Sequence, residues 1–94
     1  MKLSARSKYG LNACYYIAVS KEIISVQSLS EKMKVSSGYL EQIISILKKN
    51  NIIESQRGAQ GGYYLSREAD KITIGEIVRP LEDNFELTGC VVGE

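Results

Sequence analysis

The sequence contains no histidine and no tryptophan, and among its 94 residues it has two cysteines, one proline and one phenylalanine. The lack of histidine removes the side chain that most often serves as a general base or a metal ligand near neutral pH. Serine–histidine catalysis, cysteine–histidine catalysis and histidine-based zinc sites are therefore excluded. Because no paired carboxylates accompany a cleft motif either, we expect that the protein is not an enzyme.

The two cysteines, Cys14 and Cys90, are too few and too far apart in sequence for a disulfide framework or a zinc site, both of which use closely spaced pairs. A reducing cytoplasm is the expected location. Cys14 falls within an apolar helical pattern, which favours a small buried side chain over a reactive thiol.

Long apolar runs are also missing, since none approaches the roughly eighteen residues of a membrane span, and we expect no membrane association. The run at 13–19 follows several basic residues and loosely resembles a signal peptide. An amphipathic helix is the favoured interpretation because Tyr15 and Tyr16 interrupt that run. At this length the chain is expected to form one domain.

Charge is distributed unevenly although the net charge is only +1. Residues 1–65 hold nine Lys or Arg against four Asp or Glu, a net +5, whereas residues 66–94 hold three against seven, a net −4. Such asymmetry favours contact between the basic part and an anionic partner such as a nucleic acid. The alternative is surface charge that is merely solvated.

Three helices are predicted in the first fifty residues. In residues 7–20, Leu11, Cys14, Tyr15 and Ala18 follow the i, i+3, i+4, i+7 spacing of one helical face. Residues 25–50 contain two shorter patterns that begin at the capping residues Ser25 and Ser36. Their apolar positions are Val26, Leu29 and Met33 in the first, and Leu40, Ile43, Ile44 and Leu47 in the second. Two capped helices with a short connection predict a helix-turn-helix.

The stretch 52–66 is predicted to be a hairpin, because IIESQR and YYLS are strand patterns that flank a glycine-rich turn. Gly58, Gly61 and Gly62 permit a tight reversal that carries Arg57 to its tip. The spacing of a phosphate-binding Walker loop is absent. A helix-turn-helix followed by such a hairpin, or wing, predicts a winged helix-turn-helix, a mainly α fold with a small β-hairpin (α+β).

A further helix is predicted at 73–79, after the wing. Thr73 and Glu76 have capping-box spacing, and Ile72 and Ile77 have the spacing of a hydrophobic staple. Pro80 is expected to end this helix at Arg79, which leaves residues 80–94 as a tail.

The second helix of the helix-turn-helix has a polar face suited to reading DNA. Glu41 can accept a hydrogen bond from cytosine, and Gln42 can pair with adenine in the major groove. For Glu41 the alternative is a solvated surface charge, since a carboxylate near phosphates is repelled unless it reads a base. The expected DNA contacts, including those to phosphates, are Ser37, Tyr39, Glu41, Gln42, Ser45, Lys49, Arg57 and Gly58.

Four motifs in order, SARSKYGL at 4–11, SGYLEQI at 37–43, RGAQGGY at 57–63 and ITIGEIV at 72–78, resemble the Rrf2 family of bacterial winged-helix transcription regulators. The resemblance covers nearly the whole chain. It implies that Ser37, Tyr39, Glu41 and Gln42 belong to the helix that reads double-stranded DNA and that Arg57 enters the minor groove. It also implies a homodimer on a palindromic operator, usually acting as a repressor.

Two departures from that family pattern affect what is expected of this chain. Cys90 lies where the first of three cluster-binding cysteines would fall, and the other two are missing, so no cofactor is expected in the chain as given. An iron–sulfur cluster with Cys90 as a ligand is expected only in a longer native chain; a lone redox-sensing thiol is the other alternative. The long C-terminal helix that pairs subunits in the family is also missing. The alternative function is therefore a winged-helix module for protein–protein interaction.

Overall fold

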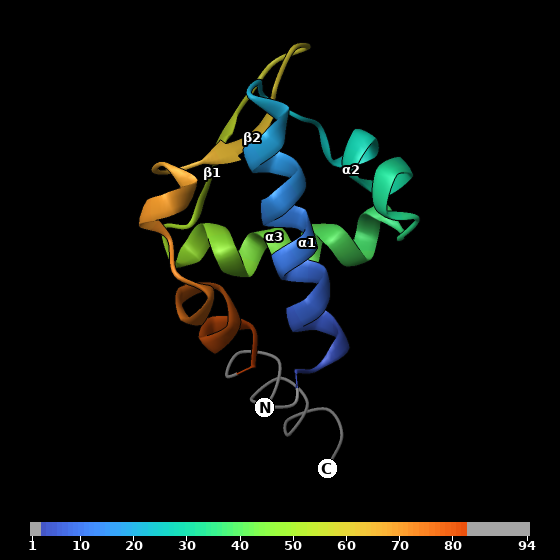
Figure 1. Cartoon of the computed structure of the whole chain (residues 1–94). Coiled ribbons are helices and arrows are strands. Elements are labelled where there is room, and N and C mark those ends of the chain that lie inside the picture. Colours follow the sequence, from blue (N-terminus) through green and yellow to red (C-terminus); the bar gives the residue numbers. More distant parts are fainter. Residues whose placement is uncertain (1–2, 83–94) are drawn as a thin grey trace.

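The structure is a computed structural model that describes residues 3–82 (Figure 1). The elements in order are α1 (Ala5–Ser20), α2 (Val26–Met33), α3 (Ser37–Lys49), β1 (Ile53–Gln56), β2 (Gly62–Leu65) and the short 3-10 helix η1 (Ala69–Lys71). A further helix occupies residues 74–82 and is called the post-wing helix. The predicted winged helix-turn-helix fold is confirmed.

The first helix begins two residues earlier than predicted and buries a different face. Its N-terminal cap is Ser4, whose hydroxyl accepts from the backbone N–H of Ser7 at 3.3 Å. The buried residues are Ser7, Gly10, Ala13, Cys14 and Ile17, whereas Tyr15 is 61% exposed. The prediction of Tyr15 as a core residue was therefore wrong. The true stripe contains small residues because other helices approach α1 closely, and small residues give little signal in an apolar pattern.

The helix-turn-helix is set by two serine caps and one apolar stripe. Ser25 accepts from the N–H of Ser28 at 3.1 Å, and Ser36 accepts from the N–H of Tyr39 at 3.2 Å. Lys34 takes a left-handed conformation at the end of α2, with φ of 58°, and turns the chain into α3. The four apolar residues predicted for α3, namely Leu40, Ile43, Ile44 and Leu47, are at most 1% exposed.

The wing is a two-stranded antiparallel hairpin that is attached to the segment between α1 and α2. Ile53 pairs with Leu65 at its base, and Gln56 pairs with Gly62 near its turn. Ile24 forms a bridge with Tyr63 through two backbone hydrogen bonds, of 3.1 Å and 2.8 Å. Ile24 therefore continues the sheet by one residue and connects the wing to the entry of α2.

The post-wing helix begins as predicted and continues past the proline. The N–H of Thr73 donates to the carboxylate of Glu76 at 2.9 Å, and the N–H of Glu76 donates to the hydroxyl of Thr73 at 3.1 Å, which completes the capping box. The expectation that Pro80 ends this helix at Arg79 was wrong, since residues 80–82 are helical. Leu81 is fully buried against Gly10 of α1, and burial of a leucine stabilises by about 1.5–3 kcal/mol, which offsets the lost hydrogen bond. Residues 83–94 of the expected tail, with Cys90, lie outside the described residues.

Glu82 ties the post-wing helix to the start of α1. One of its carboxylate oxygens accepts from the hydroxyl of Ser7, the hydroxyl of Ser4 at 2.8 Å and the backbone N–H of Ser4 at 3.2 Å. These hydrogen bonds, led by that from Ser7, hold the pKa of Glu82 below its ordinary value of 4.5. The carboxylate also lies at the positive N-terminal end of the α1 dipole.

Replacing Glu82 with glutamine is expected to make stability less sensitive to acid. Because the folded-state pKa is the lower one, the contribution of Glu82 to the free energy of unfolding is fully present above pH 4.5 and is lost as the pH falls through the folded-state pKa. Urea unfolding of the wild type and Glu82→Gln at pH 7 and in acid measures this. The wild type should be the more stable at pH 7, and the difference should shrink on acidification. A difference that is independent of pH would contradict the assignment.

Candidate nucleic-acid interface

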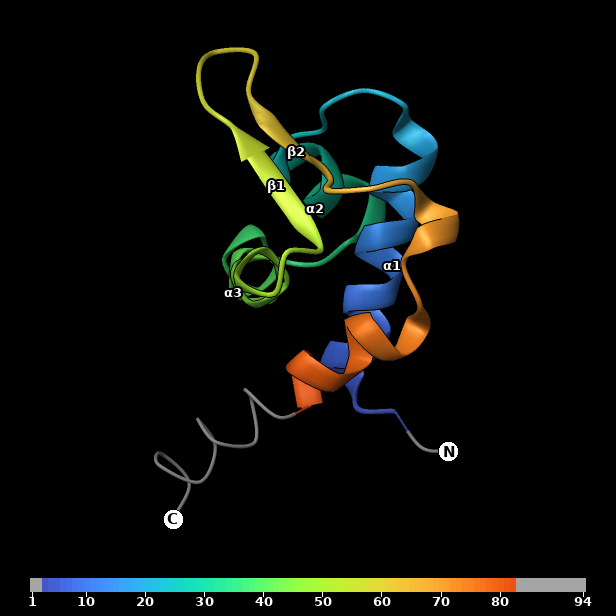
Figure 2. The ribbon, with the colours of Figure 1, turned by 90° about the vertical axis from the view of Figure 1, so that its left-hand side faces the viewer.

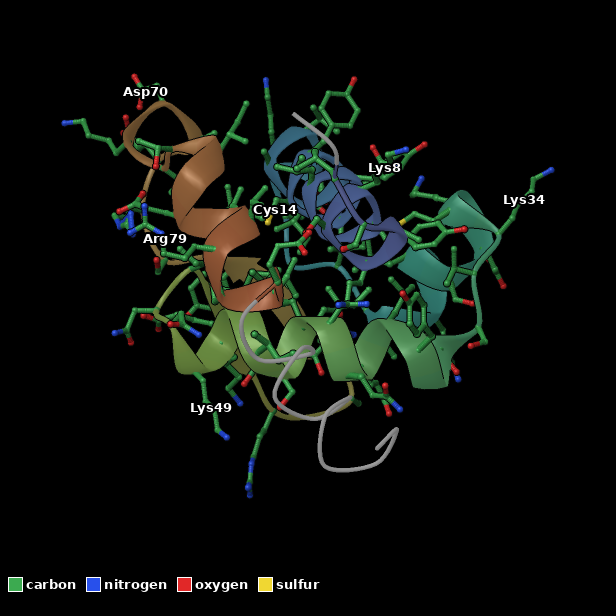
Figure 3. The ribbon with its side chains drawn as sticks, turned by 90° about the horizontal axis from the view of Figure 1, so that it is seen from below. Lys8, Cys14, Lys34, Lys49, Asp70 and Arg79 are labelled. Carbon is green, nitrogen blue, oxygen red and sulfur yellow. The ribbon has the colours of Figure 1, made fainter. Side chains whose placement is uncertain are left out.

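The face of α3 opposite its buried stripe is polar and exposed. Glu41, Gln42, Ser45 and Lys49 are exposed along it, and none of their side chains makes a hydrogen bond or ion pair within residues 3–82. Seen from below, Lys49 extends from the side of α3 that faces away from α1 (Figure 3). Unpaired donors and acceptors on one helical face are the groups that read base edges and phosphates in a DNA groove.

The first turn of α3 adds further polar groups to this face. Ser37 and Gly38 are exposed, and Tyr39 is half-buried. A side chain added at Gly38 would meet no atom within 4 Å, so the backbone is openly accessible there. The first N–H groups of a helix have no partner within that helix and are therefore available to an anion.

The wing turn is built by glycines, each for a separate reason. Gly58 has φ of 114°, a conformation that other residues rarely adopt. A side chain on Gly61 would collide with the carbonyl oxygen of Gln56, and one on Gly62 would lie 2.5 Å from the carbonyl oxygen of Ile24. The turn closes with a hydrogen bond from the N–H of Gly61 to the carbonyl of Gly58 at 2.9 Å. Arg57 is exposed beside this turn and makes no hydrogen bond or ion pair in the described part of the chain.

The wing and α3 lie on the same side of α1. Figure 2 looks along the axis of α3 and shows the hairpin rising above it, with α1 on the other side of the molecule. The structure therefore brings the predicted residues of α3 and the predicted residues of the wing, Arg57 and Gly58, onto one side.

A groove that the sequence did not predict lies between the wing and the start of α2. It has a volume of about 510 Å³ and is lined on one side by Ser25 and Val26 and on the other by wing residues that include Arg57 and Tyr63. Tyr63 is also the residue that forms the bridge with Ile24. No local sequence signal could indicate this groove, because pairing between distant segments leaves no pattern in one stretch of sequence.

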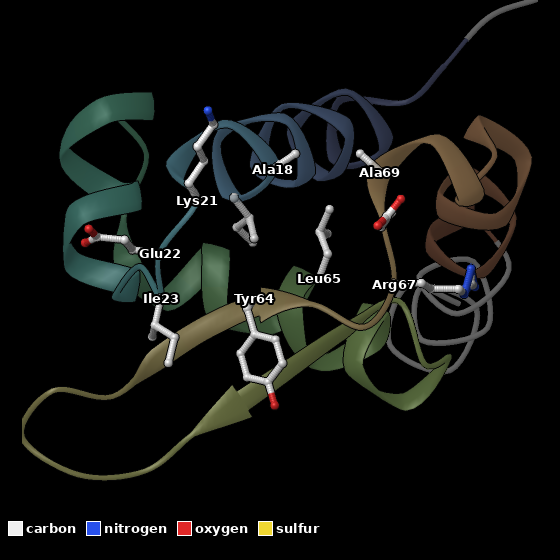
Figure 4. A pocket seen from close by; sticks show the side chains of 10 residues that line it. Ala18, Lys21, Glu22, Ile23, Tyr64, Leu65, Arg67 and Ala69 are labelled. Carbon is white, nitrogen blue, oxygen red and sulfur yellow. The ribbon is translucent and has the colours of Figure 1, made fainter.

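A second groove, of about 390 Å³, lies between the end of α1 and β2 and does not have the features of an active site (Figure 4). Its lining combines apolar side chains, such as those of Ile23 and Leu65, with the charged residues Lys21, Glu22, Arg67 and Glu68. The charged ends of Lys21, Glu22 and Arg67 point away from the groove. Arg67 instead pairs with Glu76 at 3.5 Å. These three charged ends do not converge within the groove, as the groups of a catalytic site do.

The described residues do not fit a metal or an iron–sulfur cluster. Cys14 is buried, and burial raises the pKa of its thiol to about 12, so the thiolate that binds metals is not formed near neutral pH. Within residues 3–82 no three side chains of the ligand types His, Cys, Asp and Glu come together. In the same range no helix is long and apolar enough to cross a bilayer.

Comparisons with known proteins agree on the type of protein. Residues 3–94 match the Rrf2 family, described as iron-dependent transcriptional regulators. The chain is 33% identical over 92 residues to the HTH-type transcriptional regulator IscR of Escherichia coli O1:K1 / APEC, covering 96% of this chain and 57% of IscR. The matched family consists of regulators rather than enzymes, which confirms the expectation that the chain is not an enzyme.

Solved structures of similar proteins have the same fold. CymR (YrzC), the global cysteine regulator of B. subtilis, superposes with a TM-score of 0.84 at 38% identity, covering 87% of this chain and 65% of CymR. IscR of T. potens superposes with a TM-score of 0.79 at 40% identity, covering 86% of this chain and 61% of that IscR. The chain thus spans less than two thirds of the length of these relatives.

Proposed function

Because the chain belongs to the Rrf2 family of transcriptional regulators, we propose that it binds DNA in a sequence-specific manner and so regulates transcription. The observation that carries the proposal is that α3, with its exposed polar face, and the wing, with its exposed arginine, lie on the same side of α1. In this proposal α3 lies in the major groove, where Glu41 and Gln42 meet base edges. Ser37, Tyr39, Ser45 and Lys49 contact phosphates and set the register, while Gly58 allows Arg57 to reach the minor groove.

The proposed assembly is a homodimer on a palindromic operator, where it acts as a repressor in the cytoplasm. Two copies of α3 about 34 Å apart would read two half-sites one helical turn apart. A single winged helix buries too little surface for strong discrimination, which is the physical reason for pairing. Footprinting on a selected duplex tests this, since two protected half-sites are expected; protection of one half-site alone would refute the dimer.

Iron dependence is proposed to involve residues outside 3–82. The described part offers no ligand set, so a cluster would need Cys90 together with ligands that only a longer chain supplies. Absorption spectra of anaerobically purified protein, with and without Cys90→Ser, test this proposal. The 94-residue chain is expected to be colourless. A visible cluster band that survives Cys90→Ser would contradict it.

DNA binding is expected to weaken steeply with salt. A duplex is first obtained by selection from a random pool, and its affinity is then measured by fluorescence anisotropy at several salt concentrations. Lys49 and Arg57 each displace a counterion, so the slope of log K against log salt should be about −2 or steeper. The alternative function, a protein–protein module, predicts no selected sequence and a nearly flat dependence on salt.

A further inference from the structure

Tyr9 of α1 contacts Tyr39 of α3 edge to face, with ring centroids 5.6 Å apart and planes at 90°. We propose that Tyr9 is a positioning residue for DNA binding: its ring holds the ring of Tyr39 so that the Tyr39 hydroxyl meets a DNA phosphate. The inference rests on the proposed function, because it assigns a role within the same interface. It adds a residue that lies on neither the helix-turn-helix nor the wing.

The backbone of Tyr39 is already fixed by the cap of α3. The hydroxyl of Ser36 accepts from the N–H of Tyr39 at 3.2 Å, and the carbonyl of Ser36 accepts from the N–H of Leu40 at 3.1 Å. Tyr39 is the third residue of α3, and long helical side chains lean toward the helix N-terminus. The ring of Tyr39 therefore extends along the first turn, beside the exposed Ser37 and Gly38.

The side chain of Tyr39 still has two rotatable bonds, and Tyr9 restricts them. Both rings are half-buried and pack against the core, and a perpendicular aromatic contact is a favoured geometry. Tyr9 itself is held by α1, whose neighbouring residue Gly10 is buried against Leu81. The ring of Tyr39 is thus fixed from the backbone by Ser36 and from the side by Tyr9.

The hydroxyl of Tyr39 is available to an external partner. Within residues 3–82 neither phenol group makes a hydrogen bond, although buried tyrosine hydroxyls normally find a partner. Lys8 and Lys34 are exposed at the same end of the molecule, where α1 begins and α2 ends, and make no ion pair in that range (Figure 3). A hydroxyl without a partner in the described part of the chain suits a phosphate oxygen, and exposed lysines at the same end of the molecule favour the approach of DNA.

Two tyrosines could also be in contact simply because both pack against the core. A double-mutant cycle separates this packing role from a role in positioning the Tyr39 hydroxyl for DNA. The wild type, Tyr9→Leu, Tyr39→Phe and the double variant are compared by anisotropy on the selected duplex. Tyr39→Phe keeps its ring and loses its hydroxyl, so affinity should fall about tenfold. Tyr9→Leu loses the aromatic edge and should weaken binding by about five- to tenfold. In the Tyr39→Phe background, Tyr9→Leu should have almost no further effect.

Tyr9→Phe keeps the ring and should restore the affinity that Tyr9→Leu loses. Tyr15→Leu is the matched control, because it removes one ring of the edge-to-face pair Tyr15–Tyr16 elsewhere on α1 and should bind as the wild type does. Tyr9→Met is taken through the same cycle, so that a failure of Tyr9→Leu to fold leaves the test intact; folding is followed by circular dichroism. Equal losses from Tyr9→Leu in both backgrounds, or no loss in either, would overturn the positioning role. Absence of salt-dependent binding by the wild type would instead overturn the proposed function.

Discussion

Replacing Gly62 with alanine is expected to lower the free energy of unfolding by about 2–4 kcal/mol. The new methyl group would lie 2.5 Å from the carbonyl oxygen and 2.7 Å from the carbonyl carbon of Ile24. These are backbone atoms, so the clash cannot be relieved by a rotamer change. Relief requires the wing to move away from Ile24, which breaks the two hydrogen bonds between Ile24 and Tyr63.

Gly38→Ala is the matched control for this substitution. A side-chain carbon at Gly38 meets nothing within 4 Å, and Gly38 lies inside α3 with no positive φ. Alanine should stabilise that helix by up to about 1 kcal/mol. Urea unfolding of both variants, with a check that the slope against urea is unchanged, gives the comparison. Similar stabilities for Gly62→Ala and the wild type would show that the wing is not held at Ile24.

Gln42→Ala and Arg57→Ala are each expected to weaken binding to the selected duplex by about 1–3 kcal/mol, but with different signatures. Gln42→Ala should also relax the base preference at one position of each half-site, because a bidentate contact to adenine is lost. Arg57→Ala should weaken binding and reduce its salt dependence, because a cation is lost from the DNA face. Repeating the selection with each variant and measuring affinity at two salt concentrations distinguishes these effects.

The controls for Gln42→Ala and Arg57→Ala remove side chains of the same chemical type elsewhere on the surface. Arg79→Ala removes an exposed arginine from the post-wing helix, and Asn12→Ala removes an exposed amide from α1. Both should leave the base preference unchanged, and Arg79→Ala should have a smaller effect on affinity than Arg57→Ala. If affinity for the duplex is unchanged in both Gln42→Ala and Arg57→Ala, the assignment of these residues fails.

Local sequence patterns correctly predicted those helices whose position is determined by interactions between residues close in sequence. Serine caps and a strong apolar period located α3, and Leu40, Ile43, Ile44 and Leu47 are buried as expected. The buried face of α1 was predicted wrongly, with Tyr15 on it. The true buried face includes Gly10 and Ala13, which are small so that neighbouring helices can come close. Burial of Leu81 likewise outweighs the local preference of Pro80 to end a helix.

The sequence was enough to name the residues of the candidate interface, but it did not predict how the distant segments that carry them contact one another. The exposed face of α3 follows from helical geometry, and the wing turn follows from its glycines. The bridge from Ile24 to Tyr63, the groove beside it and the contact between Tyr9 and Tyr39 join segments that are distant in the sequence. No single stretch encodes such pairings, so only the folded structure reveals them.

The tie between Ser4 and Glu82 also decides where anything joined to this domain would begin. It brings both ends of the described chain to one pole of the molecule, while the wing turn lies at the other pole (Figure 1). A fluorescent protein or an immobilisation tag joined directly at residue 3 or residue 82 would therefore start at the pole opposite the wing turn.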